Sequence, residues 1–235
     1  MHLPNYKKPI DNQLVYKLTY FIQSSCKKSS KIITEVNGTI NSLTAAVLFK
    51  KALEEKAMAM IFDFDTPKTN ELVNICKNLN LNTYILKRGK AYQTELAAYR
   101  IHKEEAIRNF YKRFVSYHLL ICADHMKAQL VDTTDKSNRL INSRPQGFYG
   151  HFIPFYSLYK TEVYDLAKFL KLPYESSAEY DYWAKIDPIL FLLSEKQSRP
   201  EEIAKEFNID LEWLKKLKHR IDKQSFESPV SQFIV

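Results

Sequence analysis

A chain of 235 residues that is 45% hydrophobic, with 15 Tyr, 14 Phe and only four Gly, has the composition of a compact globular protein. The 35 Lys and Arg residues outnumber the 27 Asp and Glu residues and give a net charge of +8, which suits an anionic partner without identifying it. Three widely separated cysteines predict neither a disulfide framework nor a zinc site. The N-terminus lacks the apolar core of a signal peptide, and no apolar run reaches the roughly 18 residues of a membrane span. We therefore expect a cytoplasmic protein without a membrane partner.

Strands and helices alternate in the first part of the predicted structure. Short apolar runs predict buried strands at 31–36, 57–64 and 82–87. Helical spacing of apolar residues predicts helices at 10–26, 43–56 and 67–79, the first of them capped by Asp11. This order is typical of an α/β fold, a doubly wound parallel sheet with flanking helices of the Rossmann-like kind.

One long helix with apolar side chains on several faces is predicted at 95–126. Phe110, Phe114 and Tyr117 are among these side chains, and one sheet cannot cover every face that carries them. We therefore expect this region to pack against a second copy of the chain in a homodimer. A fourth strand is predicted at 129–133.

Two small polar turns follow predicted strands. The first spans Asn37–Ser42 and contains Gly38, and the second spans Thr134–Ser137 and contains Lys136. Both lie at carboxyl ends of strands, where an open α/β sheet binds its ligand and where a helix N-terminus presents N–H groups to a phosphate. An ordinary βα turn also favours Gly, Asn and Ser, so the first turn alone leaves a structural role and a phosphate site both open.

A third and longer segment completes a family resemblance that includes the two turns. Residues 154–167 read PFYSLYKTEVYDLA, and this block together with the two turns resembles the ammonia-dependent NAD synthetases. That family has the loop S-G-G-[IV]-D-S, the turn G-T-x-[ND]-K-S-E and the block L-Y-K-T-E-V-x-x-L-A. The corresponding segments here are Asn37 to Ser42, Asp132 to Asn138 and Leu158 to Ala167. The resemblance implies one domain over 1–235 with the adenine nucleotide alpha-hydrolase-like fold and a C-terminal helical segment at about 187–224.

The resemblance also implies an activity and a set of binding residues. NAD synthetases use ATP and magnesium to adenylate the carboxylate of nicotinic acid adenine dinucleotide, and ammonia then displaces AMP to give the amide. We accordingly expect an adenine nucleotide or dinucleotide as the partner. The nucleotide-binding positions carried over by the resemblance are Asn37, Gly38, Thr39, Asn41, Ser42, Thr134, Lys136, Ser137, Lys160 and Ser177.

Several of these positions depart from the family pattern. Asn41 and Asn138 replace the Asp and Glu that help hold magnesium, which prefers anionic oxygens. Asn37 and Thr39 replace a Ser and a Gly, and a Cβ at position 39 obstructs close approach of a phosphate. We therefore expect weak ATP binding, no intact catalytic set and no magnesium site, as in a pseudoenzyme that keeps a nucleotide-binding or structural role. The alternative is an active synthetase with substituted metal ligands.

The regions that hold the pyridine substrate in the family differ as well. The family's Y-G-D-G loop corresponds to Gln146–Gly150, which contains no Asp. The family's G-Q-T-D-E-x-E-L-G flap is absent, because Ser176–Tyr182 leads directly to Ile186 and Pro188. Both differences argue for impaired amide formation.

The C-terminal region offers a rival function. Residues 200–207 and 208–220 have the pattern of a helix-turn-helix whose second helix is basic, as in a helix that reads DNA. The NAD synthetases carry a similar two-helix segment, and Glu201, Glu202 and Glu206 make the first helix acidic. Nucleic-acid binding is therefore only a minor alternative.

Overall fold

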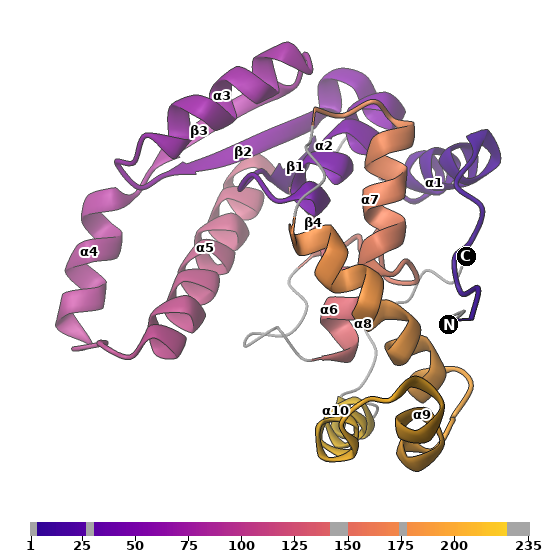
Figure 1. Ribbon diagram of the computed structural model, residues 1–235. Helices are drawn as coiled ribbons and strands as arrows, with labels where there is room; N and C mark the ends of the chain where they lie inside the picture. The colour runs from indigo at the N-terminus through magenta and orange to yellow at the C-terminus, as the bar shows by residue number, and fades with distance from the viewer. Residues whose placement is uncertain (1–3, 27–30, 142–149, 174–177, 225–235) are drawn as a thin grey trace. The chain divides into compact units, whose positions relative to one another are not determined.

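The computed structural model describes residues 4–26, 31–141, 150–173 and 178–224 (Figure 1). The chain divides into two compact units. The sheet unit comprises residues 11–133 and 145–154, and the helical unit comprises residues 1–10, 134–144 and 155–235. Each unit holds one part of the set of residues that the family resemblance selects.

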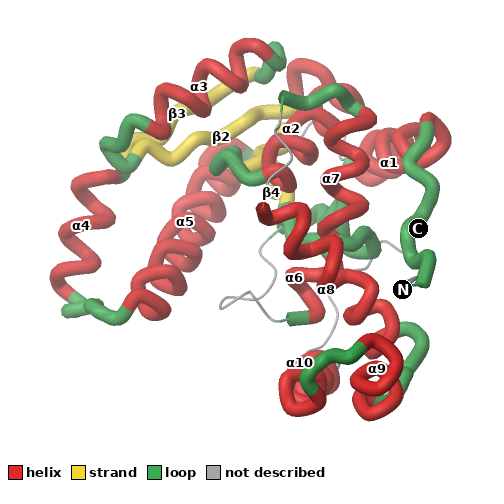
Figure 2. The backbone as a smooth tube through the Cα atoms, in the orientation of Figure 1, coloured by secondary structure: helices red, strands yellow, loops and turns green. Residues whose placement is uncertain are grey.

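The sheet unit is built on four parallel strands in the order β3-β2-β1-β4, drawn in yellow in Figure 2. The strands are β1 (Lys31–Glu35), β2 (Ala57–Asp63), β3 (Asn82–Lys87) and β4 (Ala128–Val131). All four predicted strands are present, and the parallel α/β fold with flanking helices is confirmed. β4 is displaced slightly from its predicted range, because Thr133 already belongs to the turn that follows it.

Five helices flank this sheet: α1 (Asn12–Ser25), α2 (Ile40–Leu53), α3 (Lys68–Asn78), α4 (Gly89–Ala98) and α5 (Glu104–Met126). Figure 1 shows α3 and α5 on opposite faces of the sheet. The predicted cap of α1 is present, since Asp11 Oδ1 accepts a hydrogen bond from the Leu14 N–H at 2.9 Å. α2 begins at Ile40, three residues earlier than predicted, because Thr39 caps it. Half of the predicted polar turn is therefore the first turn of a helix.

The predicted single helix at 95–126 is wrong, because the chain turns between α4 and α5. Arg100 has a left-handed φ of 50°, which ends the helical path. Glu104 and Glu105 then lie in the first turn of α5, where acidic side chains favour a helix N-terminus. Apolar periodicity continues across the break, so spacing alone did not reveal it.

One part of the core of the sheet unit lies between α5 and the strands. Val115, Leu119 and Ala123 of α5 pack there against strand residues that include Ile33 and Met60. Phe114, expected at a dimer face, is only 4% exposed, because it packs inside an aromatic cluster with Phe64 and Tyr92. The exposed apolar side chains of α5 are Tyr117, Leu120 and Ile121, at 60%, 44% and 45%.

The helical unit contains α6 (Lys136–Leu140), α7 (Lys160–Phe169), α8 (Ala178–Ser194), α9 (Pro200–Phe207) and α10 (Leu211–Gln224). The apolar faces of α9 and α10 are buried in a core shared with α8, through Ile203, Phe207, Leu214, Leu217 and Leu193. α8 begins well before the predicted helical segment at 187 and continues through Pro188. In the part of the chain that the structure describes, no helix is long and apolar enough to cross a membrane.

Candidate functional site

The loop between β1 and α2 depends on a glycine in a left-handed conformation. Gly38 has a φ of +86°, which residues with a side chain rarely adopt. A Cβ at this position would lie 3.0 Å from Leu72 Cδ2 and 3.3 Å from Lys68 Cε, and both of these residues belong to α3. The backbone angle therefore requires Gly38, and a Cβ there would in addition displace these two side-chain ends of α3.

Side chains within this loop already accept hydrogen bonds from its N–H groups. Asn37 Oδ1 accepts from the Thr39 N–H at 3.1 Å and from the Thr39 hydroxyl at 2.8 Å. Ser42 Oγ accepts from the Asn37 N–H at 3.3 Å and donates to the Thr39 carbonyl at 2.8 Å. Thr39 Oγ1 in turn accepts from the Ser42 N–H at 3.4 Å. A phosphate bound at this loop has to replace such bonds, because backbone N–H groups are the donors that hold an anion there.

Asn41 joins the loop to the segment that follows β4. Its side chain is 5% exposed, and its Nδ2 donates to the Thr133 carbonyl at 2.8 Å. Since a carbonyl oxygen only accepts, the atom facing it is the amide nitrogen, and an aspartate cannot make this bond. The sheet changes direction of winding between β1 and β4, and such a switch point is where α/β sheets bind ligands. Asn41 therefore lies at the switch point where this fold class is expected to bind a ligand, and its hydrogen bond connects the β1–α2 loop to the segment after β4.

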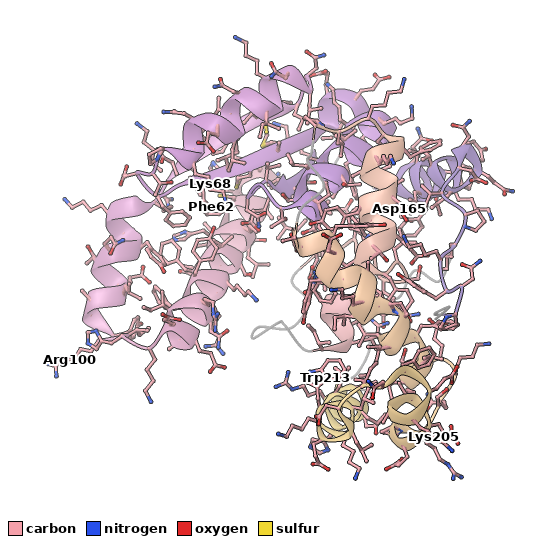
Figure 3. The ribbon with its side chains drawn as sticks, viewed as in Figure 1. Phe62, Lys68, Arg100, Asp165, Lys205 and Trp213 are labelled. Atoms are coloured by element: carbon pink, nitrogen blue, oxygen red, sulfur yellow. The ribbon has the colours of Figure 1, made fainter. Side chains whose placement is uncertain are left out.

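A cavity opens beside the loop, between the ends of β1 and β2 and helices α3 and α5. Its volume is about 60 Å³, whereas a single water molecule needs about 10–15 Å³ on this measure. Phe62, Phe64 and Tyr111 give it aromatic walls, and Glu35, Asn37 and Lys68 supply polar groups. Phe62 and Lys68 are labelled at the end of β2 in Figure 3. The cavity has room for more than bound water and is continuous with the loop through Asn37.

Sequence reasoning missed Glu35, Lys68 and Tyr111. Glu35 is a charged residue at the end of a buried strand, and Lys68 begins the helix after the next strand. Both positions lie at the ligand-binding edge of the predicted sheet, so the sequence did indicate them. Tyr111 carried none, because it lies on a helix far along the chain and meets the cavity only in the folded structure.

The carboxyl group of Glu35 has an altered protonation equilibrium. Burial raises the pKa of Glu35 to about 7, the Asn37 amide opposes this shift, the nearby Asp132 adds to it and Lys68 opposes it. Glu35 Oε1 accepts from Asn37 Nδ2 at 3.4 Å, which is long for a hydrogen bond. Burial and the charge of Glu35 raise the pKa of the Tyr111 hydroxyl as well. At neutral pH the group that faces the cavity is thus a mixture of neutral acid and carboxylate.

In the helical unit, the second polar turn is organised by Asp135. This residue is fully buried and caps α6. Its Oδ1 accepts from the Asn138 N–H and its Oδ2 from Asn138 Nδ2, both at 2.7 Å. A carboxylate only accepts, so Asn138 also presents its amide nitrogen. A glutamate at position 138 would bring two like charges together.

The two lysines that the resemblance assigns to phosphates have carboxylate partners in the helical unit. Lys136 Nζ lies 2.5 Å from Glu195 Oε1. Lys160 is 4% exposed, and its Nζ lies 3.3 Å from Glu179 Oε1 and 3.9 Å from Asp135 Oδ2. A phosphate that binds these lysines has to compete with the acids.

The matched block starts α7, and its side chains hold that helix in place. Ser137 donates to Asp187 Oδ1 at 2.6 Å and accepts from the Lys160 N–H at 2.8 Å. Asp187 Oδ2 accepts from the Thr161 N–H at 2.9 Å and from its hydroxyl at 2.8 Å. Burial raises the pKa of Asp187 to about 6, against the lowering effect of these bonds. In this conformation the Ser137 hydroxyl is fully buried and positions α7.

The structure thus places the carried-over residues in two groups. The sheet unit holds Asn37, Gly38, Thr39, Asn41 and Ser42 at the end of β1. The helical unit holds Thr134, Lys136, Ser137, Asn138 and Lys160 around the N-termini of α6 and α7. The Lys136 N–H donates to the Leu158 carbonyl at 2.8 Å, which links these two N-termini. Ser177 and residues 146–149 of the substrate loop lie outside the described residues.

Comparison with known proteins bears on both groups. The family model for NAD synthase matches residues 14–179, which include both polar turns and the block that starts α7. The chain belongs to this family. An NH(3)-dependent NAD(+) synthetase of Campylobacter jejuni subsp. doylei is 29% identical over 252 residues, which cover 94% of this chain and 98% of the relative. An NH(3)-dependent NAD(+) synthetase of Thermococcus sibiricus is 23% identical, and the match covers 85% of this chain and 87% of the relative.

Solved structures agree on the fold. The NH3-dependent NAD synthetase of Campylobacter jejuni subsp. jejuni superposes with a TM-score of 0.74 at 24% identity, over 95% of this chain and 98% of that one. The NMN synthetase of Francisella tularensis superposes with a TM-score of 0.67 at 17% identity, over 94% and 98%. These NAD synthase relatives share the parallel sheet with flanking helices and nearly the full length of the chain.

The two residues that the resemblance assigns to magnesium are amides in this structure, and the nitrogen of each donates to an oxygen acceptor. Magnesium is usually held by one or two carboxylates together with substrate phosphates. Asn41 turns its amide nitrogen to the Thr133 carbonyl, and Asn138 turns its amide nitrogen to Asp135. An N–H donor cannot ligate a cation, so the remaining candidate ligand of each amide is its neutral oxygen, which lacks the charge of a carboxylate.

Proposed function

We propose that this member of the NAD synthase family binds an adenine nucleotide or dinucleotide at the β1–α2 loop and is impaired in the magnesium-dependent adenylation that precedes amide formation in NAD synthesis. The proposal treats the chain as an NAD synthetase-like protein whose ligase reaction is weakened or lost. A nucleotide-binding or structural role then remains.

One observation carries the impaired reaction: both amides at the metal positions act as hydrogen-bond donors. Asn41 donates to Thr133 and Asn138 donates to Asp135, each to an atom that only accepts. Adenylation releases pyrophosphate, and the charge that develops has to be stabilised by groups fixed in place beforehand. Two amides in place of two carboxylates weaken the metal-binding part of that stabilisation, because each keeps one neutral oxygen but lacks the full charge.

Retained nucleotide binding rests on the geometry of the loop and the cavity. Gly38 keeps the left-handed angle that lets α3 approach the loop, and Lys68 brings a cation next to it. The cavity beside Asn37 has aromatic walls and a few polar groups, as expected for a small-molecule site. These features support weak ATP or AMP binding without a metal requirement.

The decisive experiment is ATP-dependent amidation of nicotinic acid adenine dinucleotide by the purified protein, with magnesium and ammonium supplied. We expect the rate to lie at least about a hundredfold below that of the Campylobacter jejuni relative assayed in parallel, since loss of one charge-stabilising group typically costs this much. Titration calorimetry with ATP, with and without magnesium, tests the binding part separately. A rate equal to the relative's rejects the impaired reaction.

A second candidate function is that of an active NH(3)-dependent synthetase with substituted ligands. The Campylobacter jejuni relative with this name aligns over 94% of this chain and 98% of its own length. Asp132 precedes the second turn and Asp135 lies within it, and both carboxylates are buried, at 1% and 0% exposure. Magnesium-dependent ATP binding would favour this candidate.

Nucleic-acid binding through α9 and α10 is not proposed. Lys215 of the basic helix lies 3.9 Å from Glu201 and 3.6 Å from Glu212, so part of its charge is compensated.

We do propose a homodimer, because Tyr117, Leu120 and Ile121 leave an apolar strip on α5 exposed to solvent.

A further inference from the structure

The cavity beside the β1–α2 loop has the position and lining for the base of a nucleotide whose phosphates lie on the loop. Asn37 belongs to the loop and also lines the cavity. Lys68 lines the cavity, and its Nζ comes within 3.7 Å of the point where a Cβ on Gly38 would lie. Phe62 and Tyr111 offer flat apolar surfaces. A base in this cavity would therefore be within reach of phosphates on the loop.

Glu35 is the acidic side chain in this lining. Its carboxyl group makes one hydrogen bond among the described residues, the 3.4 Å contact with Asn37 Nδ2. Because Glu35 lines the cavity, a ligand bound there can use the rest of its bonding capacity. Glutamate is rarely placed in such an apolar setting without a partner, because desolvation of its charge is costly.

We propose that Glu35 selects the base of the bound nucleotide, by pairing with the amino group and neighbouring ring nitrogen of adenine when it is protonated. This inference rests on the nucleotide binding proposed above and adds to it the residue that determines base specificity. In the ionised form the same side chain favours guanine instead.

The chemistry of the two bases gives this selection its direction. A neutral carboxylic acid has one donor and one acceptor, like the amide of Gln, which pairs with two adjacent adenine atoms. An ionised carboxylate only accepts, so it repels the ring nitrogen of adenine. It fits the N1–H and N2 amino donors that guanine presents side by side. Proton binding by Glu35 therefore changes the base that this side chain prefers from guanine to adenine.

The surroundings of Glu35 place this change in the neutral range. The charged and titratable groups that act on it are Asp132 after β4, Lys68 on α3 and Tyr111 on α5, with the Asn37 amide from the loop. Burial is the largest effect, and the pKa of Glu35 is raised to about 7. About half of the molecules therefore hold the neutral acid near pH 7.

The test compares wild type with Glu35→Gln, which keeps a donor and an acceptor at every pH. ATP affinity is measured by calorimetry at about pH 6 and about pH 8.5. Because the neutral fraction of Glu35 falls about thirtyfold between pH 6 and pH 8.5, we expect wild-type affinity to fall by about tenfold or more beyond any fall in Glu35→Gln. The phosphates of ATP titrate in the same range, and the variant reports that effect alone. Glu71→Gln removes an exposed acid of α3 and is expected to behave as wild type.

A second measurement needs only the wild-type protein. The ratio of GTP affinity to ATP affinity is expected to rise about tenfold or more from pH 6 to pH 8.5, because Glu35 ionises over that range. Equal pH profiles for wild type and Glu35→Gln, or a ratio that does not change with pH, would overturn the role of Glu35 and leave nucleotide binding intact. Failure of the wild type to bind either nucleotide at either pH would reject both the proposed function and this inference.

Discussion

The Thr39 hydroxyl donates to Asn37 Oδ1 at 2.8 Å, so two residues that depart from the family's phosphate loop are bonded to each other. The same oxygen accepts from the Thr39 N–H at 3.1 Å. A Ser and a Gly at these positions would lack this side-chain pair and would leave the N–H free to bind an anion. The loop therefore keeps the shape of a phosphate loop while one of its donors is used internally.

Restoring the family residues at both positions is expected to strengthen nucleotide binding. Asn37→Ser with Thr39→Gly removes two internal hydrogen bonds, each worth about 0.5–1.5 kcal/mol, and we expect ATP to bind about threefold to tenfold more tightly without magnesium. Calorimetry gives the affinity, and Asn70→Ser on the exposed side of α3 is the control. An unchanged affinity would show that the internal bonds do not compete with phosphate.

Asn41→Asp is expected to destabilise the sheet unit. The carboxylate would face the Thr133 carbonyl at the position of the present 2.8 Å bond, and loss of a buried pair costs about 1–3 kcal/mol. Asn41→Ala removes the bond without adding charge, so a larger loss in Asn41→Asp isolates the repulsion. Urea unfolding measures both variants, and magnesium with ATP should restore part of the loss in Asn41→Asp only. An Asp variant as stable as wild type without metal would favour the active-synthetase alternative.

Much of the fold could be read from the sequence because each strand and helix carries its own local pattern. The apolar runs of β1, β2 and β3 and the cap at Asp11 are examples, and all are present. The break between α4 and α5 was missed because the apolar spacing continues through it. Periodicity reports which face of an element is apolar, but not where the chain reverses direction.

The candidate site could be predicted from the sequence only in part. The loop from Asn37 to Ser42 is contiguous, so the family motif located it. Lys68 and Tyr111 reach the cavity from α3 and α5, and only tertiary packing shows that they meet Glu35. The hydrogen bond from the Ser137 hydroxyl to Asp187 could not be predicted from the sequence, because these residues lie 50 positions apart.

Asp187 gives the stability of the helical unit a defined pH dependence. Its pKa is about 6 in the folded protein against 3.8 ordinarily, so the folded state binds more protons between these values. The free energy of unfolding therefore falls as pH rises from about 4 to about 6, by up to about 3 kcal/mol for this group. Asp187→Asn lacks this titration, so the difference in stability between wild type and variant should shrink over that window. Urea unfolding across the window measures it, Asp181→Asn is the exposed control on α8, and a constant difference would contradict the raised pKa.

The exposed strip on α5 predicts a dimer that a single charge disrupts. Leu120 is 44% exposed, and an aspartate there would be buried in the proposed interface without a partner. We expect sedimentation velocity at micromolar concentration to show a wild-type dimer and a Leu120→Asp monomer. Ile85→Asp on β3, at 43% exposure, is the matched control and should remain dimeric. A monomeric wild type would remove the proposal.

Rebuilding the metal positions tests whether the missing carboxylates limit catalysis. The variant combines Asn37→Ser, Thr39→Gly, Asn41→Asp and Asn138→Glu. The new glutamate would lie beside Asp135, so without metal the variant should be less stable, and magnesium should offset the repulsion. We expect ATP affinity to become magnesium-dependent by about tenfold or more, since two carboxylates with phosphates suffice for this ion.

Turnover of the rebuilt variant should nevertheless stay low. Groups that act on one metal behave as a unit, so the separate substitutions are not expected to add. The substrate loop without its Asp and the absent flap, both inferred from the family resemblance, would still limit amide formation. NAD synthesis from nicotinic acid adenine dinucleotide is the readout, and the Asn37→Ser and Thr39→Gly pair, which opens the loop without adding charge, is the control. Ordinary synthetase rates from the unmodified chain would overturn this account, because they would require other groups to supply the charge stabilisation that Asn41 and Asn138 lack.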